Sequence, residues 1–95
     1  MPIDQAIIWR ALDEEDIEGL LRLGAPPDEY EEEARVIADT LARFSPQELV
    51  LDRVTTVVAD VCSRMFGPFD DEQLRRRQPV YRQVAQRILE AHQQP

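Results

Sequence analysis

The chain of 95 residues contains no lysine, because all eleven of its basic residues are arginine. This excludes Schiff-base chemistry and general-base catalysis by a lysine. The only cysteine, Cys62, has no second cysteine with which to form an intramolecular disulfide. The only histidine, His92, lies near the C-terminus, where we expect neither a Cys–His pair nor a Ser–His–Asp triad, and one histidine cannot supply the paired Glu-x-x-His motifs of a di-iron bundle. We therefore expect a protein that is not an enzyme and that has no metal site and no cofactor.

Glycine and long apolar runs are scarce as well. The three glycines disfavour a turn-rich β architecture and form no loop of the kind that cradles phosphate. The apolar runs extend over a few residues, far below the ~20 that cross a membrane. Residues 1–9 lack the basic region and the long apolar stretch of a secretory signal. We therefore expect a single cytoplasmic domain, residues 1–95.

Acidic residues, by contrast, are abundant and unevenly placed. The net charge is −8, and residues 1–33 contain eleven acidic residues and two arginines. Residues 34–95 contain eight acidic residues and nine arginines. An acidic surface repels nucleic acid and anionic lipid and attracts basic protein surfaces. The basic run Arg75–Arg77 either binds nucleic acid or phosphate, or pairs with the acidic N-terminal segments.

Apolar residues recur with the period of an α-helix along most of the chain. The clearest stripe runs from Tyr30 to Leu41. The segment 46–66 is rich in valine and threonine, but its length without a turn residue favours a helix over a strand. The pattern predicts an all-α fold: a compact four-helix bundle-like domain with a short extra helix after the first helix. The expected helices, of which the second is the extra one, span residues 3–12, 14–23, 28–43, 46–66 and 79–92.

Several residues mark the expected ends of these helices. Asp4 and Asp28 are placed as N-cap residues. Ser45 and Glu48 have the spacing of a capping box. Pro79 either kinks one C-terminal helix or opens a new one.

Three features of the sequence occur together, in a fixed order along the chain. The first is Trp9 in a short first helix; the second is the Gly24–Tyr30 junction with Glu33 after it; the third is the Ser45–Leu49 helix start followed by Phe66-Gly67. In this combination the chain, over about residues 9–89, resembles the small bacterial YugE-like family of unknown function. It departs from that pattern after Trp9, where Arg10-Ala11 replaces Asp-Pro. The resemblance implies a compact helical fold and no particular reaction, cofactor or catalytic residue.

The candidate partner-binding residues are acidic and aromatic residues of the N-terminal third. They are Trp9, Asp13, Glu14, Glu15, Asp16, Asp28, Glu29, Tyr30, Glu32 and Glu33. Carboxylates attract a basic surface, and tryptophan and tyrosine are common at the centre of interfaces. The same residues also fit a structural role, in which Asp28 caps a helix, Trp9 and Tyr30 pack inward, and the acids are solvated.

These observations predict a small non-enzymatic interaction module of the immunity, inhibitor or adaptor type. Its acidic N-terminal face would meet a basic protein partner, and neither nucleic acid nor a membrane is an expected partner. Two alternatives stay open. One is a helical bundle that binds a small ligand or a metal ion. The other is a structural homodimer joined through the wide apolar face of residues 49–66.

Overall fold

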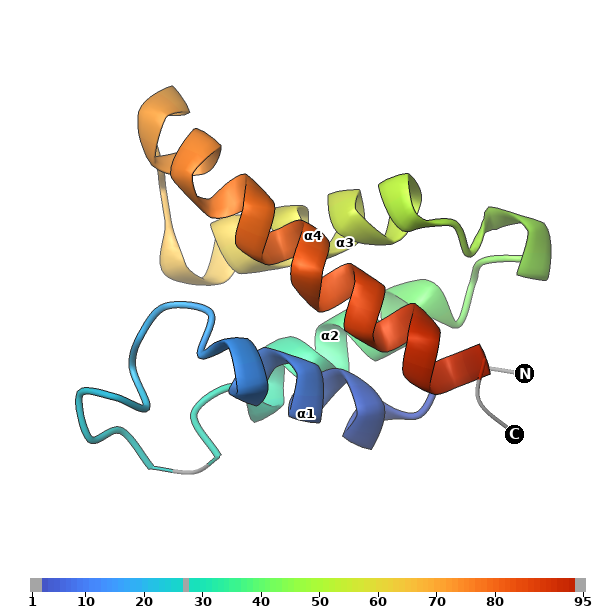
Figure 1. Cartoon of the computed structure of the whole chain (residues 1–95), viewed down its shortest axis with the longest axis horizontal. Coiled ribbons are helices and arrows are strands. Elements are labelled where there is room, and N and C mark those ends of the chain that lie inside the picture. The colour runs from blue at the N-terminus through green and yellow to red at the C-terminus, as the bar shows by residue number, and fades with distance from the viewer. Residues whose placement is uncertain (1–2, 27, 94–95) are drawn as a thin grey trace.

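The computed structural model describes residues 3–26 and 28–93 of the chain (Figure 1). The helices in these ranges are α1 (Gln5–Glu15), α2 (Glu31–Leu41), α3 (Leu51–Phe66) and α4 (Asp71–Gln93), with a 3₁₀ turn, η1 (Pro46–Glu48), before α3. No β-strand occurs in the described ranges. The structure thus confirms the all-α prediction and the four main helices. None of the helices in these ranges is long and apolar enough to cross a membrane.

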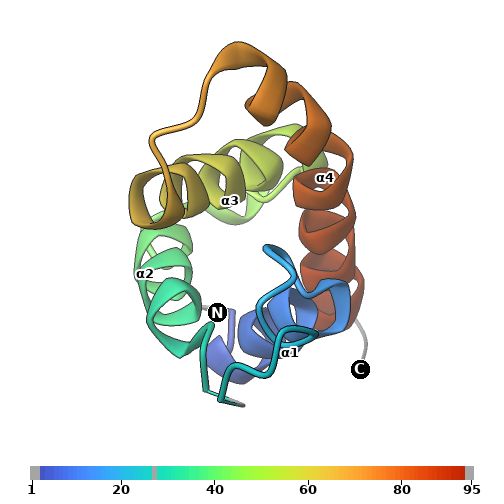
Figure 2. The same ribbon diagram turned by 90° about the vertical axis from the view of Figure 1, so that its left-hand side faces the viewer.

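The four helices form a closed ring in which each contacts two others. α1 packs against α2 and α4, and α3 packs against the same two helices. Figure 2 shows this ring with the loop after α1 in the foreground. The molecule is flattened, with principal extents of 34 × 29 × 18 Å. Buried side chains from all four helices form one apolar core.

α1 begins close to the predicted start and ends later than expected. The Asp4 carboxylate caps it, as predicted, by accepting a hydrogen bond from the Ala6 N–H at 2.9 Å. Ile8 and Leu12 are completely buried, so the predicted apolar face is the one that packs. The helix stops at Asp16, whose backbone is left-handed with φ 45°, a conformation that cannot continue a right-handed helix.

The predicted short helix over residues 14–23 is wrong. The chain from residue 16 to residue 24 forms successive turns, and residues 16–26 are called the turn segment below. The Asp16 carboxylate accepts hydrogen bonds from the N–H groups of Leu21 and Arg22, both at 3.0 Å. An acidic side chain that binds nearby backbone N–H groups offers the chain an alternative to helical hydrogen bonds. Asp16 therefore closes a set of turns rather than opening a helix.

α2 begins at Glu31 rather than at residue 28. Tyr30 occupies the N-cap position without a side-chain cap, so the prediction that Asp28 caps this helix is wrong. The Glu31 N–H instead donates to the Asp28 backbone carbonyl at 3.1 Å, in a turn that precedes the helix. The glutamates of the first turn, Glu31–Glu33, lie where carboxylates complement the partial positive charge of a helix start.

The helix predicted over residues 46–66 is divided in two. The Glu48 carboxylate accepts a hydrogen bond from the Ser45 N–H at 2.9 Å, as the capping box predicts, but the helix that follows is only η1. Val50 is extended, with φ −115° and ψ 157°, a conformation that suits a β-branched residue, and α3 starts after it. α3 is a helix and not a strand, which confirms that part of the prediction.

The last helix begins well before residue 79 and contains Pro79, so the alternative of a single C-terminal helix is confirmed and the predicted start at this proline is wrong. Asp70 and Gln73 hold the start of α4. The Gln73 N–H donates to Asp70 Oδ1 at 2.8 Å, and the Asp70 N–H donates to Gln73 Oε1 at 2.9 Å. A proline inside a helix removes one backbone hydrogen bond. The reciprocal bonds stabilise the first turn, and α4 continues through Pro79.

Candidate functional site

Tyr30 is the centre of a buried hydrogen-bond cluster and not part of an exposed surface. Its side chain is fully buried. Its hydroxyl donates to Asp16 Oδ1 at 2.7 Å and accepts from the N–H groups of Glu18 and Leu20 at 3.1 and 3.2 Å. Its ring meets Phe66 edge to face, with 6.1 Å between the ring centroids. The inward-packing alternative is therefore confirmed, and the surface role predicted for Tyr30 is wrong.

Asp16 belongs to the same hydrogen-bond cluster. Its carboxylate also accepts hydrogen bonds from two N–H groups later in the turn segment. Burial acts to raise the pKa of Asp16, but hydrogen bonds from Tyr30, Leu21 and Arg22 outweigh it and hold the pKa below its usual 3.8. Burial, and then the bond to Asp16, raise the pKa of Tyr30 to about 12. At neutral pH Asp16 is therefore ionised and Tyr30 is protonated, which is the combination that makes a strong charge-assisted hydrogen bond.

Glu18 ties the turn segment to α4. The Arg77 guanidinium donates to both carboxylate oxygens of Glu18 at 2.9 Å and lies 3.8 Å from the centre of the Phe69 ring. The side chains of Glu18 and Arg77 are only 11% and 26% exposed. For Arg77, the structure confirms pairing with the acidic N-terminal segments. Sequence analysis did not select Glu18, because its partner lies 59 residues away and no local pattern marks the pair.

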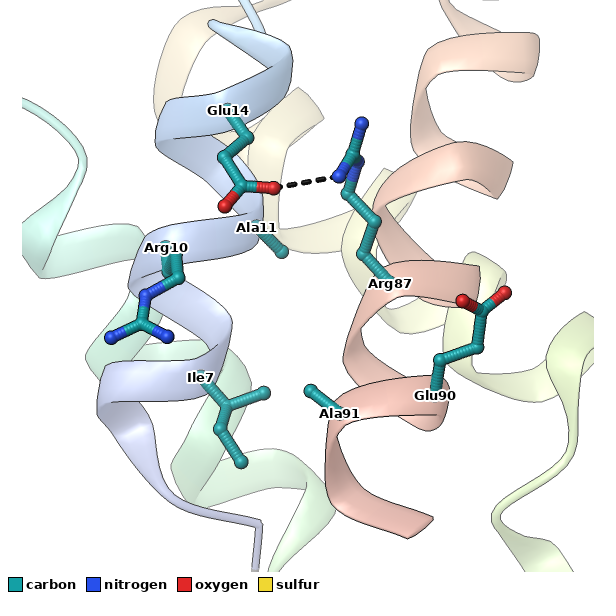
Figure 3. A pocket seen from close by; sticks show the side chains of 7 residues that line it. All are labelled: Ile7, Arg10, Ala11, Glu14, Arg87, Glu90 and Ala91. Atoms are coloured by element: carbon teal, nitrogen blue, oxygen red, sulfur yellow. Dashed lines mark hydrogen bonds and ion pairs between the residues drawn. The ribbon is translucent and has the colours of Figure 1, made fainter. Parts of the chain in front are cut away.

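Glu14 and Glu15 are held by another arginine of α4. Arg87 donates to Glu14 Oε2 at 2.6 Å and to Glu15 Oε2 at 2.7 Å. The Glu14 contact lies at one end of a cavity of about 200 Å³ between α1 and α4 (Figure 3). Ile7, Ala11 and Ala91 form its apolar lining, whereas the charged ends of Arg10 and Glu90 extend away from it. Glu14 and Glu15 thus both pair with Arg87 of the same chain.

Glu33 is also unavailable to a partner. It is only 5% exposed and forms no ion pair with any residue in the described ranges. Burial raises the pKa of Glu33, and the charges of Glu29 and Glu32 add to the increase. Burial raises the pKa of the Cys62 thiol to about 12, and the nearby charge of Glu33 contributes. Cys62 is therefore an unreactive core residue, and the surface role predicted for Glu33 is wrong.

Four further acids lie just before α2 or in its first turn, and three of them are exposed. Asp28 and Glu31 are exposed and Glu29 is half-buried, and none of the three pairs with an arginine in residues 3–26 or 28–93. Glu32, also exposed, pairs with Arg35 one turn further along. We call Asp28, Glu29, Glu31 and Glu32 the acidic end of α2. In Figure 1 it follows the turn segment at one end of the molecule.

Trp9 and Asp13 lie one turn apart on α1, and both are partly buried. Together with Ala6, Arg10 and Glu14 they line a hollow of about 380 Å³. Trp9 Nε1 and Asp13 Oδ1 are covered, and neither has a hydrogen-bond partner within the part of the chain that the structure describes. Burial raises the pKa of Asp13, and the charge of Asp16 adds to the increase. Trp9 is thus neither a fully buried core residue nor a freely exposed one.

Neither the described residues nor the comparisons with known proteins point to a particular ligand or activity. Among the described residues, no three histidine, cysteine, aspartate or glutamate side chains are grouped so that they could hold a metal ion. No protein-family model matches the chain, and comparisons with curated proteins and with solved structures likewise found no match. The resemblance to the YugE-like family stays a prediction, and function has to be inferred from the residues above.

Proposed function

We propose that this protein is a non-enzymatic interaction module that binds a basic partner protein through the acidic end of α2. The observation that supports this best is a contrast between two groups of acids. Glu14, Glu15 and Glu18 are held by arginines of α4, whereas Asp28 and Glu31 are exposed and have no arginine partner in the described ranges. The second group is free to meet cations from outside the chain.

The acidic end of α2 gives a partner a compact target. Glu31 and Glu32 follow each other in the first turn of α2, and Asp28 and Glu29 lie just before it. Closely spaced carboxylates create a local negative potential, which steers a basic surface and increases the association rate. Individual exposed ion pairs contribute little. The attraction therefore depends on the number of carboxylates more than on any one of them.

The neighbouring turn segment keeps this end of the molecule in one conformation. The hydroxyl of Tyr30 and the carboxylate of Asp16 bind its backbone, and the Glu18–Arg77 pair joins it to α4. A surface that is already ordered loses less conformational entropy on binding. Such a module would serve as an inhibitor, an adaptor or an immunity protein, in each case by covering a basic surface of its partner.

A pull-down from native lysate with three forms of the tagged full chain tests the proposal. The first form is the wild type. The second lacks three acids at the start of α2, through Asp28→Asn, Glu29→Gln and Glu31→Gln. The matched control instead lacks three exposed acids of α3 and α4, through Asp60→Asn, Asp71→Asn and Glu72→Gln.

We expect the wild type and the control to capture the same basic protein, and the second form to capture much less of it. Capture should fall as the salt concentration is raised, because exposed charges are screened. Circular dichroism of all three forms shows whether each is folded. Equal capture by the three forms, or no salt-sensitive partner for the wild type, would contradict the proposal.

A further inference from the structure

The turn segment exposes a large apolar side chain to solvent. Leu23 is 83% exposed, whereas Val50 and Met65, the other exposed large apolar residues in the described part of the chain, are 49% and 40% exposed. The uncharged residues that follow Leu23 end at Pro26, which is also exposed. We call residues 23–26 the apolar tip. Burying a leucine that the free protein leaves in water is favourable for any partner that can enclose it.

The backbone fixes the position of Leu23. The Ala25 N–H donates to the Leu20 carbonyl at 3.0 Å, and the Gly24 N–H donates to the Leu21 carbonyl at 3.1 Å. These two bonds form a Schellman motif, and Gly24 has the left-handed φ, 94°, that the motif needs. Leu20 and Leu21 pack against the core, which leaves Leu23 outside. An apolar side chain on an ordered backbone loses little conformational entropy when a partner binds it.

Negative charge lies next to the apolar tip. The acidic end of α2 follows it in the chain, and the Glu29 N–H donates to the Pro26 carbonyl at 3.1 Å in the turn between them. Both lie at the same end of the molecule (Figure 1). On the other side of the tip, the charge of Arg22 is opposed by Asp16, whose carboxylate lies 3.7 Å from the guanidinium. A partner that encloses Leu23 therefore meets these carboxylates too.

We infer that the apolar tip enters an apolar pocket on a basic partner protein, and that lysine or arginine side chains at the edge of this pocket face the acidic end of α2. The inference rests on the proposed function and names the surface of the partner. Stable interfaces have an apolar centre and a polar rim, and Leu23 supplies the centre that the carboxylates lack. A second copy of this chain, with its net charge of −8, and an anionic lipid surface are both repelled by the acids beside the tip.

The two parts of this surface affect different steps of binding. Exposed charges act mainly on the association rate, and salt weakens their effect. Buried apolar contact acts mainly on the dissociation rate, and it does not depend on charge. Substitutions at Leu23 and at the acidic end of α2 should therefore have effects that can be told apart.

A small pocket of known chemistry tests the tip directly. β-Cyclodextrin has an apolar cavity, and monoamino-β-cyclodextrin carries one ammonium group at its rim. The full chain, labelled at its leucine methyl groups, is titrated with each compound and followed by NMR. We expect saturable shifts of the Leu23 methyl resonances with both compounds, and roughly two- to fivefold tighter binding of the charged one at low salt. The form with Asp28→Asn, Glu29→Gln and Glu31→Gln should bind both equally.

The basic protein that the wild type captures from lysate provides the second test. It is purified, and its binding to the wild type, Leu23→Ser and the control Val50→Ser is measured at low and high salt, with circular dichroism as the check on folding. We expect Leu23→Ser to bind about ten- to a hundredfold more weakly at both salt concentrations, through faster dissociation. Val50→Ser should bind like the wild type, because Val50 lies before α3 and not at the tip.

Three results would overturn the inference alone: no saturable shift at Leu23, equal binding of the two cyclodextrins to the wild type, or wild-type affinity of Leu23→Ser for the captured protein. The proposed function stands in these cases if the form without the three acids still captures less of that protein. Equal capture by that form, or no capture by the wild type, would overturn both proposals, because no cation of a partner would then face the acidic end of α2.

Discussion

The hydroxyl of Tyr30 organises the turn segment, and Tyr30→Phe isolates its contribution. The substitution keeps the buried ring and its edge-to-face contact with Phe66. It removes the hydrogen bond to Asp16 and the two hydrogen bonds from the N–H groups of Glu18 and Leu20. Its effect on stability therefore measures the hydrogen bonds and not the packing.

The expected loss follows from the three bonds. The bond to Asp16 ends on a charged carboxylate, and bonds of this kind contribute about 1.5–3 kcal/mol. The two N–H groups lie in a partly buried segment and regain some hydrogen bonding from water, so each adds less than about 1 kcal/mol. We expect the free energy of unfolding to fall by roughly 2–4 kcal/mol. For a chain of this size, that lowers Tm by roughly 10–25 °C.

Urea denaturation followed by circular dichroism measures this loss, and Tyr81→Phe is the matched control. Tyr81 is as buried as Tyr30, but its hydroxyl has no hydrogen-bond partner among the described residues; the Ser63 hydroxyl is nearby without hydrogen-bond geometry. We expect the control to leave stability unchanged or to raise it slightly. Amide hydrogen exchange at Leu20 should be faster in Tyr30→Phe alone. Equal effects of the two substitutions would refute the reasoning.

Three further predictions concern the buried and partly buried ionisable groups. Glu33 has a raised pKa in the folded state, so the wild type should lose stability as the pH rises above the usual 4.5 toward the folded pKa. Urea titrations at several pH values should show little of this loss in Glu33→Gln. The same pH dependence of stability in both proteins would contradict the prediction. Arg77→Lys loses the two-point contact with Glu18 and the stacking on Phe69, and should lower the free energy of urea unfolding by about 1–3 kcal/mol, whereas Arg76→Lys, at an exposed pair, should not change it. Cys62, with a thiol pKa of about 12, should react with a thiol reagent only at the rate of unfolding, and rapid labelling of the native protein would show that it is accessible.

The helices are predictable from the sequence because the information that specifies them is local. Ile8, Ile37 and Val58 are buried and recur within stripes of helical period. The Asp4 cap and the bond from the Ser45 N–H to Glu48 likewise join residues that are two and three positions apart. Rules based on spacing apply to contacts of this kind.

The turn segment is not predictable in the same way, because distant residues decide its conformation. The acids at positions 13–16 fit the start of a new helix as well as the end of α1. The hydroxyl of Tyr30 decides between the two when it binds Asp16 from 14 residues away. Arg77 reaches Glu18 from 59 residues away. A sequence-based list of surface acids therefore includes residues that the folded chain uses internally.

The acidity of the N-terminal third has two physical roles. Glu14, Glu15 and Glu18 bind arginines of α4, so this part of the charge helps to close the ring between the first and the last helix. The acidic end of α2 is different, because a helix start carries a partial charge of only about +0.5 and Arg35 adds one more cation. Four closely spaced carboxylates exceed what these two can balance, so this end of the molecule keeps a negative potential. This negative potential is the property on which the proposed binding of a basic partner rests, and it also favours solubility.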